Sequence, residues 1–141
     1  MREKSCGTIP YTVRDGKIYY MLIATQNRDF YGFPKGHTEA CESEEETALR
    51  ETYEETGLTP KITEGFRHEM LVPLKNGNDK LIAFFTADFG EQIPSNVEGF
   101  ENFHYVITTF EDAKEKITQK ATREMLILAN KFLLKKHSSE R

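Results

Sequence analysis

The hydrophobic residues of this chain follow two different periods. Two runs rich in β-branched and aromatic residues, 8–13 and 18–24, flank Asp15-Gly16, a dipeptide typical of tight turns. This pattern predicts an N-terminal β-hairpin. The next stretch, 27–36, contains glycine and proline breakers and predicts a loop.

Further strands are expected downstream. Apolar and aromatic residues are concentrated in 62–74, 81–89 and 103–108. An Asn-Gly-Asn turn at 76–78 and a polar loop at 92–99 separate these segments. The sequence therefore predicts three more strands.

Two segments have the character of helices. In 43–56, Ser43 is followed three residues later by Glu46, which is the pattern of a capping box, and Gly57 is a natural terminating residue. The C-terminal segment has apolar residues at helical spacing, which predicts a helix packed on the sheet. That stripe comprises Ala121, Met125, Leu128 and Phe132.

The order of these elements favours an α/β (α+β) fold. Strands before and after a middle helix, together with a closing helix, predict a mixed-sheet sandwich with helices on both faces. A chain of 141 residues with 38% hydrophobic residues is the size of one ordinary domain. We therefore expect a single domain spanning 1–141.

Charge and composition exclude several classes of protein. The net charge of −4 argues against a general grip on nucleic acid, which needs many cationic side chains. The sequence contains neither an apolar run long enough to span a membrane nor an apolar leader at its start. The two cysteines, Cys6 and Cys41, match no zinc or disulfide pattern. These features predict a cytoplasmic protein.

The distribution of acidic residues along 43–56 calls for an explanation. The glutamates at 44–46 suit the positive end of a helix dipole, whereas Glu51, Glu54 and Glu55 share one face near its negative end. Like charges at this spacing cost about 0.2–0.5 kcal/mol per pair, and Arg50 can offset only part of this. One interpretation is a solvated acidic face. The other is a platform for a hard cation such as Mg²⁺, which prefers carboxylate oxygens.

The spacing around this helix is more specific than its charge. Fixed intervals separate the following residues: Gly36, Glu42, Arg50, Glu51, Glu54, Glu55 and Gly57. This pattern resembles the signature of the Nudix (MutT-like) hydrolases, and the preceding segment 33–37 adds to the resemblance. Two departures occur. Thr52 stands where the family usually has a bulky aliphatic residue, and Ala40-Cys41 stands where many members have Pro-Gly.

The resemblance implies an α/β/α sandwich that hydrolyses a nucleoside diphosphate linked to another group, using Mg²⁺ or Mn²⁺. It implies that Arg50 orients a glutamate and that Glu42 supports the geometry of the loop and helix. A further glutamate is expected from a later loop, with Glu101 preferred and Glu98 second. The implied metal ligands are Glu51, Glu54, Glu55, the carbonyl of Gly36 and Glu101.

The chemistry implied by the resemblance needs a base and cationic contacts. A metal-bound water would lose its proton to Glu51 or to Glu101. Lys35 and His37 could bind phosphate oxygens, although His37 is equally well explained as a hydrogen-bonding loop residue. No covalent nucleophile is required.

The substrate is less sharply indicated. The segments 34–39 and 64–69, together with Thr52, resemble the diadenosine tetraphosphate hydrolase branch, and the second segment would place basic side chains near a long phosphate chain. Phe84 and Phe103 could stack on adenine, or could belong to the core.

Rival substrates within the same chemistry are (deoxy)nucleoside triphosphates, ADP-ribose and the 5′ end of RNA. A non-catalytic nucleotide-binding module is the alternative from another class. The expected partner is a small nucleotide polyphosphate, with no membrane and no extended nucleic acid, and the protein could be a monomer or a homodimer.

Overall fold

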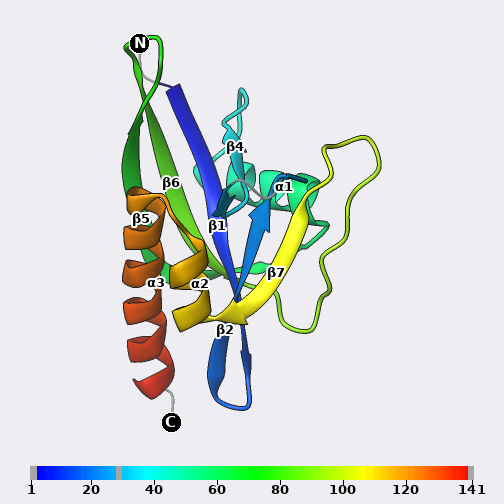
Figure 1. Ribbon diagram of the computed structural model, residues 1–141, viewed down its shortest axis with the longest axis vertical. Helices are drawn as coiled ribbons and strands as arrows, with labels where there is room; N and C mark the ends of the chain where they lie inside the picture. The colour runs from blue at the N-terminus through cyan, green and yellow to red at the C-terminus, as the bar shows by residue number, and fades with distance from the viewer. Residues whose placement is uncertain (1–2, 28–29, 140–141) are drawn as a thin grey trace.

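The computed structural model of the protein describes residues 3–27 and 30–139 (Figure 1). Its strands and helices follow in this order: β1 (Glu3–Arg14), β2 (Lys17–Ala24), β3 (Tyr31–Gly32), β4 (Lys35–His37), α1 (Glu44–Thr56), β5 (Lys61–Pro73), β6 (Asp79–Asp88), β7 (His104–Thr109), α2 (Phe110–Lys116) and α3 (Lys120–Ser139). Among these described residues, no helix is both long and apolar enough to cross a bilayer.

The described strands form one seven-stranded mixed sheet. Its main path is β3-β2-β1-β6-β5, with β4 paired to β1 and β7 paired to β2. β1 and β6 run parallel, with Gly7 opposite Phe84, and the other pairs are antiparallel. The parallel pair at the centre brings together segments that are more than 70 residues apart in the sequence.

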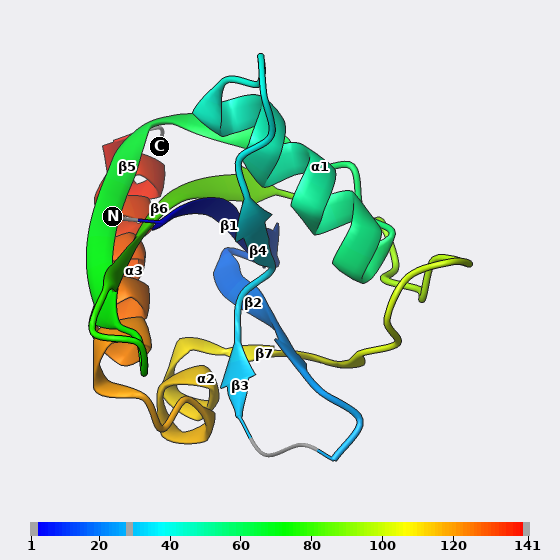
Figure 2. The ribbon, with the colours of Figure 1, turned by 90° about the horizontal axis from the view of Figure 1, so that it is seen from above.

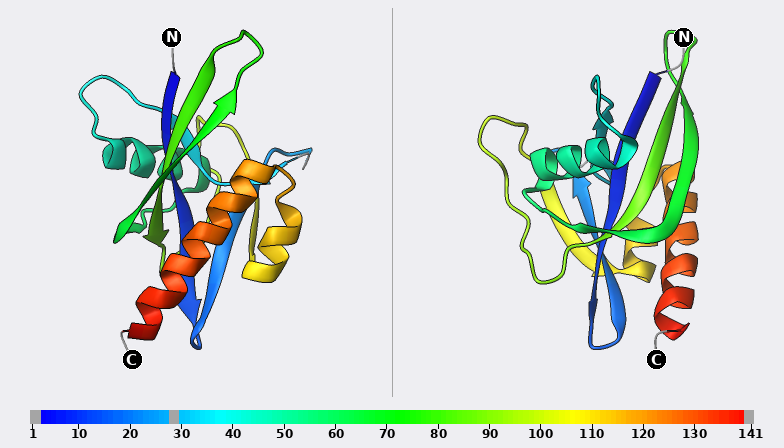
Figure 3. Two further views of the ribbon diagram at one scale, coloured as in Figure 1. Left: turned by 90° about the vertical axis from the view of Figure 1, so that its left-hand side faces the viewer. Right: turned by 180° about the vertical axis from the view of Figure 1, so that it is seen from behind.

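Helices cover both faces of this sheet (Figures 2 and 3). α1 packs against β1 and β4 on one face, and α2 and α3 lie on the other, where α3 packs against β5. Alternation along β1 explains this, because successive side chains point to opposite faces. Cys6 joins a cluster with Ala48 of α1, whereas Ile9 and Tyr11 join the cluster beneath α3. The predicted mixed-sheet sandwich is confirmed.

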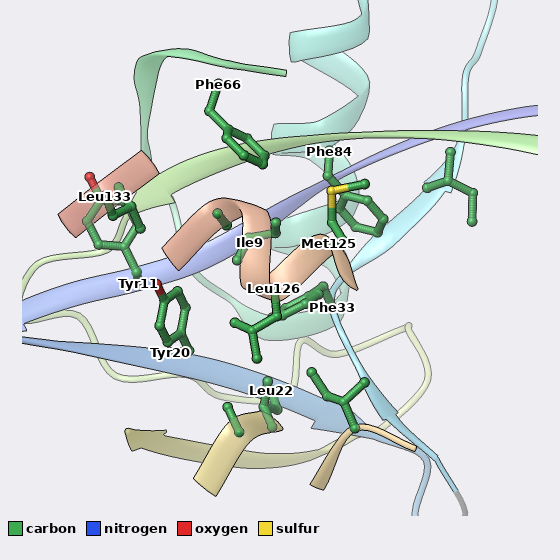
Figure 4. Packing of buried hydrophobic residues seen from close by; sticks show 14 residues of the cluster. Ile9, Tyr11, Tyr20, Leu22, Phe33, Phe66, Phe84, Met125, Leu126 and Leu133 are labelled. Atoms are coloured by element: carbon green, nitrogen blue, oxygen red, sulfur yellow. The ribbon is translucent and has the colours of Figure 1, made fainter. Parts of the chain in front are cut away.

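The larger core lies between the sheet and α3 (Figure 4). Phe84 and Phe33 meet edge to face, with ring centroids 6.1 Å apart. From α3, Met125 and Leu126 are 3% and 0% exposed, and Leu133 is fully buried. Burying such side chains contributes about 1.5–3 kcal/mol each, which makes this cluster the main support of the sheet.

Three details differ from the sequence predictions. The segment expected as a loop contains two short strands, β3 and β4, because backbone pairing with β2 and β1 overrides its glycines and proline. Helix α2 was not predicted. In α3, Leu128 is 43% exposed, because the buried stripe is rotated onto 122, 125, 126, 129 and 133.

Candidate active site

Helix α1 carries the signature glutamates, and local sequence fixes both of its ends. The Ser43 hydroxyl accepts a hydrogen bond from the Glu46 amide, and the Ser43 amide donates to the Glu46 carboxylate. At the far end Gly57 adopts φ 75°, and its amide donates to the carbonyl of Tyr53. The predicted capping box and terminating glycine are confirmed.

Thr52 fastens α1 to the sheet. The residue is fully buried, and its hydroxyl donates to the carbonyl of Ala48 at 2.7 Å. The same hydroxyl lies 2.7 Å from the hydroxyl of Thr8 in β1. A polar pair therefore replaces the aliphatic contact that the resemblance implied. Because hydrogen bonds are directional, this pair fixes the rotation of α1 relative to β1.

Cys41 occupies a strained position in the loop before α1. Its φ of 69° lies in the left-handed region that favours glycine, the residue many family members have there. The turn nevertheless forms and aims Glu42 at the helix. One oxygen of Glu42 accepts from the Glu39 amide at 3.1 Å and from the Thr47 hydroxyl at 2.9 Å.

Arg50 is the centre of a charged network. Its Nε lies 2.7 Å from one oxygen of Glu42, and its Nη2 donates to the other oxygen at 3.1 Å and to the carbonyl of His37 at 2.9 Å. Its Nη1 donates to Glu51 at 2.8 Å and to Glu54 at 3.2 Å. Hydrogen bonding to Arg50 lowers the pKa of Glu42 to about 2. The predicted orienting role of Arg50 has a structural counterpart in these bonds.

Gly36 lies directly against the carboxylate of Glu51. A Cβ atom at Gly36 would be 2.0 Å from Glu51 Cδ and 2.1 Å from Oε1, far inside van der Waals contact. The Glu51 side chain is only 15% exposed, and this burial raises its pKa. The strand β4 and helix α1 therefore meet at a point where only glycine leaves room for the carboxylate.

Glu55 is the most desolvated carboxylate of the site. Burial is the main cause that raises its pKa to about 8, and the charges of Glu51 and Glu101 act in the same direction. The Lys35 amide donates to it at 3.3 Å, and both this bond and the Lys35 charge partly oppose the rise. The structure thus brings the signature glutamates together on one face of α1, as expected.

The later loop, 89–103, joins β6 to β7 and carries both further candidates. Glu101 is exposed but close enough for its charge to act on Glu55. Glu98, the second candidate, is exposed as well. The preference for Glu101 over Glu98 stays a prediction.

A pocket of about 280 Å³ opens beside Glu55. Glu55 and Lys35 line one part of it. The other lining residues come from β2, the segment before β4, the later loop and the turn before α3: Ile23, Ala24, Thr25, Phe30, Tyr31, Gly32, Phe33, Phe103 and Gln119. A larger, more open hollow of about 530 Å³ near Thr59 and Gly90 contains no signature residue.

The two aromatic candidates for base stacking have different surroundings. Phe103 lines the pocket, and its contact with substrate stays a prediction. Phe84 does not, because it is 1% exposed and packed against Phe33 in the core, so the prediction that it contacts substrate is wrong. Phe30, which is 60% exposed, and Tyr31 also line the pocket, although no pattern in the sequence singled them out.

The basic residues predicted to bind phosphate also differ in their surroundings. Lys35 faces the pocket, whereas His37 is exposed and pairs with Glu3 at 3.1 Å. Arg67, from the segment expected near phosphate, instead forms an ion pair with Glu44 at 2.7 Å. Lys80 was missed. Burial, and then the charge of Lys35, lower the pKa of Lys80, whereas the charges of Glu51 and Glu55 oppose this, so its ammonium group lies within range of these site residues.

The donors present suit a hard divalent cation, although they do not form a closed site. Among the described ranges, no three His, Cys, Asp or Glu side chains converge closely enough to hold a metal ion. Arg50 instead lies between Glu51 and Glu54. Within the part of the chain that the structure describes, the half-buried Glu55 carboxylate accepts one long bond, from the Lys35 amide, and a bound cation would compensate its charge.

The chain matches the NUDIX domain over residues 1–128, and it belongs to the Nudix family. It is 36% identical over 80 residues to the protein from Rattus norvegicus named bis(5′-nucleosyl)-tetraphosphatase [asymmetrical]. It is 44% identical over 80 residues to the Mus musculus protein of the same name. Each match covers 50% of this chain and 54% of the relative, so the chain spans about half the length of these curated relatives. The resemblance predicted from the sequence is confirmed.

Solved structures show the same architecture. A Caenorhabditis elegans (C. elegans) Ap4A hydrolase binary complex is similar with a TM-score of 0.83 and 24% identity, covering 94% of this chain and 98% of that one. The NUDIX domain of Shewanella oneidensis NrtR complexed with ADP ribose has a TM-score of 0.74 and 17% identity, covering 94% and 89%. These likenesses establish the fold.

Proposed function

We propose that this protein is a metal-dependent pyrophosphohydrolase that cleaves diadenosine tetraphosphate or a related dinucleoside polyphosphate asymmetrically. Mg²⁺ is the expected ion and Mn²⁺ the alternative, and the cytoplasm is the expected compartment. One observation carries the proposal. Glu55 and Lys35 line a pocket with aromatic walls, and Glu55 lies on the same face of α1 as Glu51, whose carboxylate lies against Gly36.

The carboxylates would hold the metal. Glu51, Glu54 and Glu55 provide oxygen ligands from one rigid helix, with the carbonyl of Gly36 and the later Glu101 as further ligands. When bound, the ion would lower the pKa of a coordinated water and neutralise phosphate charge. Arg50 would keep Glu51 and Glu54 oriented through its hydrogen bonds.

Other residues of the site would bind the substrate and accept the proton of the attacking water. Lys35 and the nearby Lys80 would neutralise phosphate oxygens, which a purely acidic site would repel. Either Glu51 or Glu101 would accept the proton of the attacking water. Water adds across one P–O–P bridge, and a tetraphosphate cut off-centre leaves a nucleoside triphosphate and a nucleoside monophosphate.

The pocket would bind one nucleoside end. Its volume of about 280 Å³ lies at the low end for small-molecule sites, so a whole dinucleotide would not fit inside. Phe103, Phe30 and Tyr31 offer ring faces for stacking on a base. The names of the matched relatives support the same substrate class.

The test is product release from a panel of substrates with Mg²⁺ or Mn²⁺: diadenosine tetraphosphate, ADP-ribose, dGTP and 5′-triphosphorylated RNA. We expect fastest turnover of diadenosine tetraphosphate and a loss of about 10²-fold or more in Glu54→Gln. Glu45→Gln, at an exposed site in the first turn of the same helix, is the matched control. Unchanged turnover in Glu54→Gln would refute the metal assignment. Binding without turnover by the wild type would indicate a nucleotide-binding module.

A further inference from the structure

The loop before β7 is attached to the C-terminal end of α1, beside which it lies (Figures 2 and 3). The Ser95 amide donates to the carbonyl of Thr56 at 2.8 Å, which satisfies one of the free carbonyls at the helix end. The two segments are closely packed, since a Cβ on Gly57 would lie 2.8 Å from the carbonyl oxygen of Ser95. The loop is therefore fixed at Ser95 relative to the candidate site.

Asn96 closes the next part of the loop. Its Oδ1 accepts a hydrogen bond from the Phe103 amide at 2.8 Å, seven residues ahead in the chain. The Tyr105 hydroxyl lies 2.6 Å from the same oxygen and 3.0 Å from the carbonyl of Glu55, and it donates its one proton to either acceptor. Asn96 thus joins both ends of the segment 97–102 and links it to the helical turn that carries Glu55.

Apart from the Asn96 bonds, few hydrogen bonds among the described residues hold the segment 97–102 in place. Inside it, the Phe100 amide donates to the carbonyl of Val97 at 3.2 Å, a bond that makes one turn and does not reach beyond the segment. Glu101 is exposed. Phe103 is different, because its ring is partly buried against a cluster that includes Leu58. Loss of the Asn96 bonds should therefore release Glu101 while the Phe103 ring stays in place.

We propose that Asn96 is a positioning residue for the hydrolysis described under Proposed function, on which this inference rests. Its carboxamide oxygen holds the segment 97–102 closed, and so keeps Glu101 near Glu55. Asn96 does not itself contact substrate. Its effect on the reaction is transmitted through Glu101.

The first test compares Asn96→Ala with Asn96→Asp, which retains an acceptor oxygen. We expect kcat for diadenosine tetraphosphate to fall about 10- to 100-fold in Asn96→Ala, as a displacement near 1 Å can cause, with KM within about threefold. Asn96→Asp should recover most of kcat. The control is Asn76→Ala, which removes a similar bond, from the Asn78 amide at 3.0 Å, in the turn between β5 and β6.

The second test asks whether Asn96 acts through Glu101. In a Glu101→Gln background, Asn96→Ala should lower kcat no further, because the group it positions is already gone. An equal loss in both backgrounds would overturn the proposal, as would a wild-type kcat in Asn96→Ala.

Hydrogen exchange separates this inference from the proposed function. The Phe103 amide should be protected in the wild type and in Asn96→Asp, and should exchange faster in Asn96→Ala. An active wild type with an unprotected Phe103 amide would overturn the proposal that Asn96 holds the segment 97–102 closed, but not the proposed function. An inactive wild type with a protected amide would overturn the proposed function, and with it the catalytic role of Asn96.

Discussion

Replacement of Gly36 by alanine tests the geometry of the site most directly. The new Cβ would lie 2.0 Å from the Cδ atom of Glu51, whereas carbon atoms in contact are about 3.5–4.0 Å apart. The Glu51 carboxylate must therefore move by about 1.5 Å or more. Gly36 does not have a positive φ, so the alanine backbone itself is unstrained. The substitution should therefore displace the Glu51 carboxylate and hardly change the stability of the fold.

A displacement of about 1 Å can reduce catalysis by about 10²-fold, so we expect kcat of Gly36→Ala to fall by at least that factor. Mn²⁺ affinity, measured by electron paramagnetic resonance, should fall as well, while the melting temperature changes by only a few degrees. The control is Gly32→Ala, whose Cβ meets no atom within 4 Å. Gly32 lines the pocket, so KM is free to change there, but kcat and Mn²⁺ affinity should not. Wild-type kcat and Mn²⁺ affinity in Gly36→Ala would refute this reasoning.

Three further predictions concern Thr52, Glu55 and Lys80. Thr52→Val should lower the free energy of unfolding by about 1–3 kcal/mol in urea titrations, because it leaves the Thr8 hydroxyl unpaired, and the double variant Thr8→Val/Thr52→Val should lose less than the sum of the single changes. Burial raises the pKa of Glu55 from 4.5 to about 8, so the folded state binds the extra proton and metal-free stability should decline as pH rises from about 5 to about 8. The decline is at most about 5 kcal/mol, and Glu55→Gln should abolish it in EDTA-treated samples; a decline that persists in this variant would contradict the assignment. Lys80→Met should raise KM for diadenosine tetraphosphate about tenfold with less effect on kcat, and an unchanged KM would remove Lys80 from the phosphate site.

Local signals in the sequence predicted α1 and its glutamates well. Ser43, Glu46 and Gly57 fix the helix ends through bonds to near neighbours, so its bounds and the face that carries Glu51 and Glu55 need no tertiary information. The signature spacing also indicated that Gly36 belongs with this helix, and the structure places it against Glu51 across a short connection, while its role as a metal ligand stays a prediction.

Features that depend on long-range pairing were not predictable in this way. Lys80 comes near Lys35 because β6 pairs in parallel with β1, a contact that no local pattern encodes. Phe84 was misassigned because residues 82–87 of β6 are all buried, on both faces of the sheet, which removes the alternation that separates core from pocket. In α3, apolar residues occupy more than one face, so Leu128 fitted the predicted stripe although it faces solvent.

The two cysteines differ in accessibility, and this difference has a practical use. Cys6 is fully buried beneath α1, whereas Cys41 is exposed and immediately precedes Glu42. A maleimide dye should therefore attach selectively at Cys41 in the native chain. Such a label would provide a fluorescent reporter of ion and nucleotide binding without prior mutagenesis.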